Sequence, residues 1–208
     1  MANGETTTGS ESERPVVNVV GERVALGPLR RDMIPAYVRW MNDFTATRGI
    51  AMQSRPMTAE AEEAWYADAS AVKPDQVNFT IYEVDGWRPV GNGDLREIDH
   101  LNRTATLGIL IGEPDARGRG LGTEAVRLLL DYGFRALGLA NIWLAVYEYN
   151  LAGRRAYEKA GMTLVGRRRE SRWHLGQWWD ECYYEALAED FPESAVRPLL
   201  DTGAARDR

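Results

Sequence analysis

A glycine-rich stretch in the middle of the chain, residues 117–123, has the composition of an anion-binding loop. An apolar run over residues 106–111 leads into it and a helical pattern over residues 124–134 leads out, so the order is strand, loop and helix. Glycines let backbone amides approach a phosphate closely, and the first amides of a helix lack partners and lie at its positive end. The candidate phosphate-binding residues are Arg117, Gly118, Arg119, Gly120, Leu121, Gly122 and Thr123.

The glycine spacing separates several kinds of loop. A Walker loop needs Gly-Lys-Ser/Thr after its glycines, and this stretch has none. A dinucleotide loop needs Gly-x-Gly-x-x-Gly, whereas these glycines stand at 118, 120 and 122, which disfavours NAD. The pattern Arg/Gln-x-x-Gly-x-Gly/Ala does fit residues 117–122. It resembles the pyrophosphate loop of the GNAT N-acetyltransferases, which bind acetyl-CoA. An ordinary glycine-rich turn that starts a helix is the structural alternative.

A second pattern runs from Asn150 to Met162. Asn150, Arg154 and Tyr157 are spaced to share one helix face, where they could line a groove for a slender chain with amides, such as pantetheine. A phenol at the end of that groove could protonate a leaving thiolate. The stretch resembles the GNAT pattern Asn-x-x-(Ala/Ser)-x-x-x-Tyr-x-Lys-x-Gly-Phe, with Gly153 and Met162 as departures. The alternative is that Tyr157 is a core aromatic and Asn150 only caps a helix.

The similarity covers the chain from about Val24 to Leu187 and looks like the ribosomal-protein-alanine and spermidine acetyltransferase branch of the family. Residues 39–43, 90–111 and 176–184 carry this part of the resemblance. It implies a mixed α/β GNAT fold, with a mostly antiparallel seven-stranded sheet, one parallel and splayed strand pair, and flanking helices. It also implies that Ile109, Leu110 and Ile111 contact acetyl-CoA and that a backbone amide near Ile109 or Leu110 binds the oxyanion.

The catalytic base and the acceptor site are less well defined. Some relatives carry a catalytic Glu in the strand before the Asn, but this chain has Ala145 there. Asp94, Glu97 and Asp180 are the candidate replacements, with solvated strand residues as the alternative. Since the two substrates of the family approach from opposite sides, the candidate acceptor contacts are Trp40, Asn42, Arg55 and Trp173.

The elements that must position these residues follow from periodicity and punctuation. The sequence predicts strands near residues 22–29, 77–84, 87–98, 103–111, 141–147, 162–173 and 177–187. Asp32 and Thr58 are expected to cap two helices, and residues 43–57 form the loop between them. A third helix follows the glycine-rich loop and ends at Gly138, and a fourth runs from Leu151 to Ala160 and is closed by Gly161.

Composition bounds the remaining possibilities. The 208 residues are enough for one domain, expected over residues 16–190 with a disordered tail at 1–15 and a flexible one at 191–208. The net charge of −6 argues against a nucleic-acid-coating surface. A lone cysteine and two histidines leave no convincing metal site. No apolar run is long enough to span a membrane and the N-terminus lacks an apolar signal segment, so we expect a cytoplasmic protein. Its oligomeric state stays open, a homodimer included.

These features predict an acetyl-CoA-dependent N-acetyltransferase that acts on a small-molecule or peptide amine. A non-catalytic CoA-binding regulatory module on the same fold is the alternative, which the absent Glu favours and the presence of Tyr157 and Asn150 disfavours. A turnover assay that detects free thiol over a panel of amines separates the two hypotheses.

Overall fold

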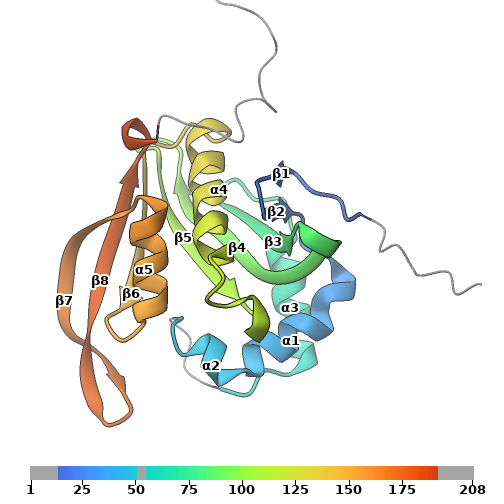
Figure 1. Cartoon of the computed structure of the whole chain (residues 1–208), viewed down its shortest axis with the longest axis horizontal. Helices are drawn as coiled ribbons and strands as arrows, with labels where there is room; N and C mark the ends of the chain where they lie inside the picture. Colours follow the sequence, from blue (N-terminus) through green and yellow to red (C-terminus); the bar gives the residue numbers. More distant parts are fainter. Residues whose placement is uncertain (1–13, 51–54, 192–208) are drawn as a thin grey trace, which may run out of the picture.

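The computed structural model describes residues 14–50 and 55–191, which contain one open sheet with the strand order β1-β2-β3-β4-β5-β6-β8-β7 (Figure 1). The strands are β1 Val19–Val20, β2 Val24–Gly27, β3 Gln76–Glu83, β4 Arg88–Asp99, β5 Thr104–Ile111, β6 Asn141–Tyr147, β7 Thr163–His174 and β8 Gln177–Leu187. Neighbours are antiparallel except for β5 and β6, so the expected mixed sheet with one parallel pair is confirmed. The strand that the sequence missed is β1, whose two residues are too few to show a period.

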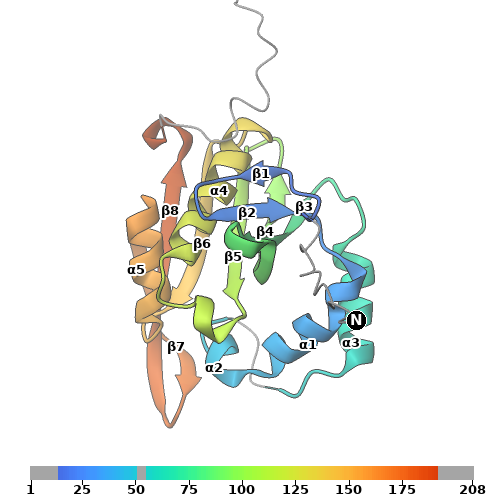
Figure 2. The same ribbon diagram turned by 45° about the vertical axis from the view of Figure 1, so that its right-hand side comes forward.

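Helices cover both faces of the sheet. They are α1 Ile34–Asn42, α2 Phe44–Thr47, α3 Ala59–Ala69, α4 Leu121–Arg135 and α5 Leu151–Ala160, with short 3-10 turns at Arg31–Met33, Asp85–Trp87, Pro114–Ala116 and Ala188–Asp190. Adjacent residues of β5 show the two layers, because successive strand side chains point to opposite faces. Ile109 packs with the cluster that contains α4 and α5, and Leu110 packs with α1 and Tyr66 of α3. Figure 2 shows α4 and α5 on one side of the strands and α1 and α3 on the other.

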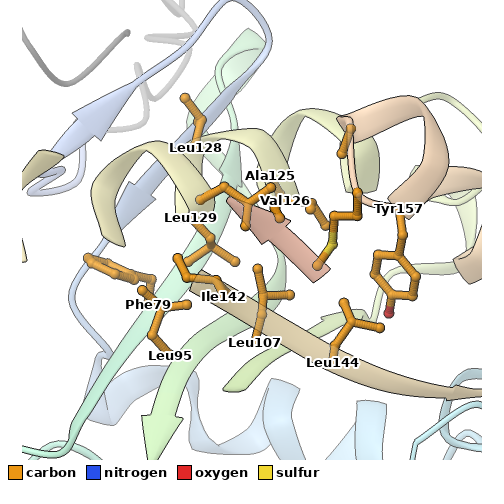
Figure 3. Close-up of a cluster of buried hydrophobic side chains, with 14 of the residues drawn as sticks. Phe79, Leu95, Leu107, Ala125, Val126, Leu128, Leu129, Ile142, Leu144 and Tyr157 are labelled. Atoms are coloured by element: carbon orange, nitrogen blue, oxygen red, sulfur yellow. The ribbon is translucent and has the colours of Figure 1, made fainter. Parts of the chain in front are cut away.

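The main core lies between the sheet and the α4–α5 layer. Apolar residues of α4 recur at helical spacing and are fully buried against strand residues, among them Leu129 of α4 beside Leu95, Leu107 and Ile142 (Figure 3). Burying such side chains contributes roughly 1.5–3 kcal/mol each, which makes this layer the rigid base of the molecule.

Helix ends match the sequence signals in most places. The Thr58 hydroxyl accepts from the amide of Ala61, as an N-cap should, and Gly161 adopts a left-handed conformation at the end of α5. The prediction for Asp32 is wrong: α1 starts after a 3-10 turn with no side-chain cap, and Asp32 instead pairs with Arg30. A charged partner two residues away competes with the backbone for this carboxylate.

The parallel pair opens after a short contact. β5 and β6 pair only from Thr104 to Thr106 with Asn141 to Trp143, and beyond that point residues 107–111 and 144–147 have no pairing across the gap. Parallel strands normally exchange evenly spaced hydrogen bonds along their length. The backbone groups that face this gap are therefore left for another partner, as the predicted splay requires.

The predicted tails and the predicted loop at 43–57 have different outcomes. The expected tails at 1–15 and 191–208 fall almost wholly outside the described residues. The loop at 43–57 contains α2, a helix of a single turn, which is too short to show a helical period. In the described part of the chain, no helix is long and apolar enough to cross a membrane.

Candidate active site

The glycine-rich loop ends in the first turn of α4. Gly118 and Gly120 have φ angles of 74° and 85°, a left-handed conformation that favours glycine, and Gly120 is the N-cap of the helix. Among the described residues, none accepts a hydrogen bond from the backbone N–H groups of residues 118–123. These groups stand at the positive end of a 15-residue helix. The loop is thus suited to an oxyanion such as a phosphate.

The two arginines of the loop contact protein atoms. The Arg117 guanidinium donates to the carbonyl oxygens of Ile111 and Gly112, at 3.0 and 2.6 Å, and pairs with Asp43 at 2.8 Å. Arg119 pairs with Glu83. Both side chains therefore hold the loop against the rest of the fold, and their contact with a phosphate stays a prediction.

The start of α4 packs on the end of β5, so the loop borders the gap. An added Cβ at Gly122 would lie 3.4 Å from Cγ1 of Ile111. Ile109 and Leu110 precede it in the segment of β5 that has no neighbour across the gap. This is where the sequence places the oxyanion donor.

Asn150 begins α5 and accepts from the amide of Gly153 at 3.0 Å, so it caps the helix as expected. Its amide nitrogen faces Gly49, where an added Cβ would lie 2.4 Å away. Arg154, one turn further, donates to the hydroxyl of Tyr184 at 3.3 Å and to the carbonyl of Glu148 at 3.5 Å. These contacts fix the start of α5 beside the end of β6.

Tyr157 hangs from α5 with its hydroxyl directed away from the helix and its ring beside Leu144 of β6 (Figure 3). The side chain is 8% exposed, and no described residue forms a hydrogen bond with its hydroxyl. Burial raises the pKa of Tyr157 to about 12, and the charge of Arg96 acts in the opposite direction. The phenol is therefore protonated at neutral pH and has no protein acceptor for its proton, as a proton donor to a ligand requires.

Of the candidate bases, Asp94 lies beside the unpaired segment of β5. It stands opposite Gly108 of β5, pairs with Arg96 at 2.7 Å, and its side chain is 24% exposed. Burial raises the pKa of Asp94, and the charge of Arg96 partly offsets that effect. Sequence reasoning missed Arg96. Its signal was the alternation Asp94-x-Arg96 on a strand, which gains meaning only once the register puts Gly108 alongside.

The other two carboxylates are engaged elsewhere. Glu97 accepts from the hydroxyl of Thr106 at 2.5 Å and sits in a bulge, with a φ angle of 54°. Asp180 accepts from the amide of Glu170 at 3.1 Å and lies 3.5 Å from Arg167. Their contacts suit structural roles at the strand irregularity and in the β7–β8 hairpin.

The expected acceptor contacts divide into buried and exposed groups. Trp40 is 1% exposed and its indole N–H donates to Glu113 at 2.9 Å, so its side chain is engaged in packing, and its contact with the acceptor stays a prediction. Asn42 bonds both the N–H and the C=O of Met57 and so ties the two ends of the 43–57 loop. Arg55 and Trp173 are exposed.

Aromatic residues that the sequence did not single out line the sheet face opposite α5. Trp143 of β6 is 37% exposed and stacks on Tyr183 of β8, with ring centroids 6.1 Å apart. Tyr149 stacks on His174 at 4.6 Å, and its hydroxyl donates to the carbonyl of Arg48 at 2.8 Å. Through these two contacts Tyr149 joins the segment after α2 to the β7–β8 hairpin. Both regions therefore lie near the end of β6, the strand that carries Ala145. Periodicity marks β6 as apolar on both faces but cannot show that one face lacks a covering helix.

In the described part of the chain, no cluster of three or more His, Cys, Asp or Glu side chains could hold a metal ion. The arrangement offers instead an amide-lined loop, an open strand gap, a buried phenol and a carboxylate. Such a set can bind a phosphorylated carrier and support proton transfer.

The same regions are shared with known proteins. The family described as "Acetyltransferase (GNAT) domain" matches residues 23–163. Alpha/beta-tubulin-N-acetyltransferase 9 from Homo sapiens is 31% identical over 157 residues, which are 68% of this chain and 72% of that protein. Spermidine N(1)-acetyltransferase from Escherichia coli K12 is 37% identical over 86 residues, which are 41% of this chain and 45% of that protein.

Solved structures agree on the fold. A crystal structure of spermidine N-acetyltransferase from Vibrio cholerae in complex with CoA and spermine has a TM-score of 0.74 at 21% identity and covers 82% of this chain and 99% of that chain. The family match includes the glycine-rich loop, Asn150 and Tyr157. The chain therefore belongs to the acetyltransferase (GNAT) domain family and is an N-acetyltransferase.

Proposed function

We propose that this chain transfers the acetyl group of acetyl-CoA to a primary amine, by direct attack of the amine on the thioester. One observation carries the proposal: the free amides of residues 118–123 and the phenol of Tyr157 border the same unpaired segment between β5 and β6. A carrier with a pyrophosphate at one end and a thioester at the other fits this order of groups.

Each part of the site has its own role in the proposed reaction. The loop amides hold the pyrophosphate, while Asn150 and the gap-facing backbone of residues 107–111 hold the pantetheine arm. A backbone N–H near Ile109 or Leu110 stabilises the oxyanion when the amine nitrogen bonds the carbonyl carbon. As the C–S bond breaks, Tyr157 gives its proton to the thiolate. Holding the two reactants in place can itself contribute several kcal/mol.

The acceptor binds on the other side of the sheet, next to Asp94. One carboxylate oxygen of Asp94, Oδ2, pairs with Arg96, and the other has no hydrogen-bond partner among the described residues. A protonated amine can bind that oxygen before it loses its proton. The exposed Trp143, stacked on the half-buried Tyr183, and the exposed Trp173 would contact the remainder of the acceptor. Relatives named for spermidine and for tubulin support an amine of a polyamine or of a protein.

The experiment is a turnover assay of the purified chain with acetyl-CoA, in which released CoA is followed with a thiol reagent. Spermidine and peptides with a free N-terminus are the first acceptors to test, and mass spectrometry should find one added acetyl group on the amine. CoA binding without transfer to any acceptor would favour the non-catalytic CoA-binding module instead.

A further inference from the structure

Asp94 and Arg96 lie on one face of β4, opposite the face that carries the buried Leu95. Their ion pair, 2.7 Å between Oδ2 and Nη1, is formed within one strand. Side chains two residues apart on a strand are neighbours on the same face, so this pairing needs no help from another element. The space that the pair occupies, however, depends on the neighbouring strand, β5.

Gly108 of β5 makes room for that pair. It stands directly opposite Asp94 in the register, and an added Cβ would lie 2.3 Å from Oδ1 of Asp94 and 2.4 Å from Nη1 of Arg96. The backbone of Gly108 is not left-handed, so its conformation does not require glycine. The missing side chain instead lets the pair lie across β5, toward the open gap.

Tyr157 approaches the gap from the opposite face of the sheet. It belongs to the core under α5, next to Leu144, whereas Arg96 lies on the outer face. An intact strand pair would separate the two side chains, but β5 and β6 stop pairing after Thr106. Through this opening the charge of Arg96 acts on the phenol. A second ionisable neighbour is Tyr184 of β8, with ring centroids 6.1 Å apart, and its hydroxyl is bound to Glu158 and Arg154.

We propose that Arg96, held over Gly108 by Asp94, is a positioning residue that stabilises the anion of Tyr157 through the gap between β5 and β6. The inference rests on the function proposed above. In the reaction the amine forms the C–N bond, the C–S bond breaks, and the thiolate takes the proton of Tyr157. The phenol is left as a tyrosinate in a buried site, where a nearby cation is the group that favours the charged form. The ammonium first loses one proton to solvent to become the attacking amine, and the second proton, which the nitrogen releases after the C–N bond has formed, restores the phenol, so the cycle is balanced.

The direct test replaces Tyr157 with a fluorinated tyrosine and follows its ionisation by ¹⁹F NMR, without any substrate. Removing a cation makes the anion less stable, so Arg96→Gln should raise the pKa of this phenol by about one unit. Arg168→Gln is the matched control, since Arg168 also pairs with a strand carboxylate, Glu181, at 2.7 Å. An unchanged pKa in folded Arg96→Gln would overturn the proposal.

A kinetic cycle tests the same link during turnover. Arg96→Gln should lower kcat about tenfold when Tyr157 is present and should have almost no further effect in Tyr157→Phe. Gly108→Ala should reproduce the loss because it displaces the ion pair. Gly166→Ala, on a strand position where an added Cβ would meet nothing within 4 Å, should be neutral.

The two measurements also separate this inference from the function it rests on. A full tenfold loss from Arg96→Gln in the Tyr157→Phe background would show that Arg96 acts by another route, and would overturn the proposal. If no amine is acetylated by the wild-type chain, the proposed function fails, while the ¹⁹F titration still decides whether Arg96 acts on Tyr157.

Discussion

Arg117 and Asp43 form an ion pair, with 2.8 Å between Nη2 and Oδ2, that joins the glycine-rich loop to the start of α2. The same guanidinium binds the carbonyl oxygens of Ile111 and Gly112, so three separate segments meet at one side chain. Asp43 also caps α2 by accepting from the amide of Thr45. The glycine-rich loop is thus held in place by contacts within the protein, as a preformed binding site would be.

The first prediction concerns this pair and pH. The hydrogen bond from Arg117 is the main cause that lowers the pKa of Asp43. A carboxylate whose pKa is lowered by folding stabilises the fold above its unfolded pKa and loses that effect as pH falls through the folded value. Asp43→Asn keeps a good cap, and we expect it to lower the free energy of unfolding by roughly 0.5–1 kcal/mol at pH 7, since the pair is partly exposed.

Urea unfolding at pH 7 and at pH 3 checks this prediction. The difference between wild type and Asp43→Asn should shrink at pH 3, because the carboxyl of the unfolded chain then takes up a proton more readily than the carboxyl paired with Arg117. Asp68→Asn, which removes the carboxylate of an exposed pair with Lys73, is the control and should change stability less. An equal difference at both pH values would show that the ion pair is not the cause.

The second prediction tests the loop. Gly120→Ala strains a residue with a φ angle of 85° and brings its Cβ within 2.9 Å of Arg23. We expect CoA affinity, measured by calorimetry, to fall about tenfold or more, which is roughly 1.4 kcal/mol. Gly138→Ala is the matched control, because it has a φ angle of 69° beyond the other end of α4 and an added Cβ would meet nothing within 4 Å. Both variants should lose similar stability. If they bind CoA with equal affinity, the loop has a structural role only.

The third prediction concerns the proton donor. Tyr157→Phe should lower kcat about a hundredfold, the usual scale for a general acid, and leave the KM for acetyl-CoA unchanged. Stability should hold, because the hydroxyl that is removed has no hydrogen-bond partner among the described residues. Tyr132→Phe changes another phenol whose pKa burial raises, far from the gap, and should keep wild-type kcat. Wild-type turnover in Tyr157→Phe would return Tyr157 to a role in the core.

The fourth prediction places the acceptor amine. Asp94→Asn removes the charge with little change in shape, so the KM for the acceptor should rise about tenfold while the KM for acetyl-CoA stays the same. Glu97→Gln should have a smaller effect, because Glu97 is already bound to Thr106. Steady-state kinetics with the best acceptor of the panel measures both. If neither variant alters the acceptor's KM or kcat, the amine binds elsewhere.

Local signals in the sequence predict much of this fold. The glycines at 118 and 120, the caps at Thr58 and Asn150, and the apolar period of α4 act over a few residues, and the structure has each of them. The two-residue strand β1 and the one-turn helix α2 are too short to show a period, so they were not predicted.

The site was harder to predict because it depends on register between strands. The pairing of β4 with β5 decides which side chain lies over Gly108, and neither strand's sequence alone specifies that pairing. Burial is a second property that the sequence does not show, since only the fold reveals that the indole of Trp40 is buried against Glu113. Arg96 was missed because its position over Gly108 follows from the strand register.

The short contact between β5 and β6 also has a mechanical consequence. The half of the sheet formed by β1 to β5 leads into the glycine-rich loop, and the half formed by β6, β8 and β7 is joined to it in the sheet by three residue pairs near Thr104 and Asn141. We expect those pairs to act as a pivot between the two halves, which in the proposed function hold the thioester and the acceptor. We expect a substitution at Asn141, remote from the chemistry, to change the width of the gap and hence the fit of both substrates, which makes the pivot a place to tune the enzyme without touching a reacting group.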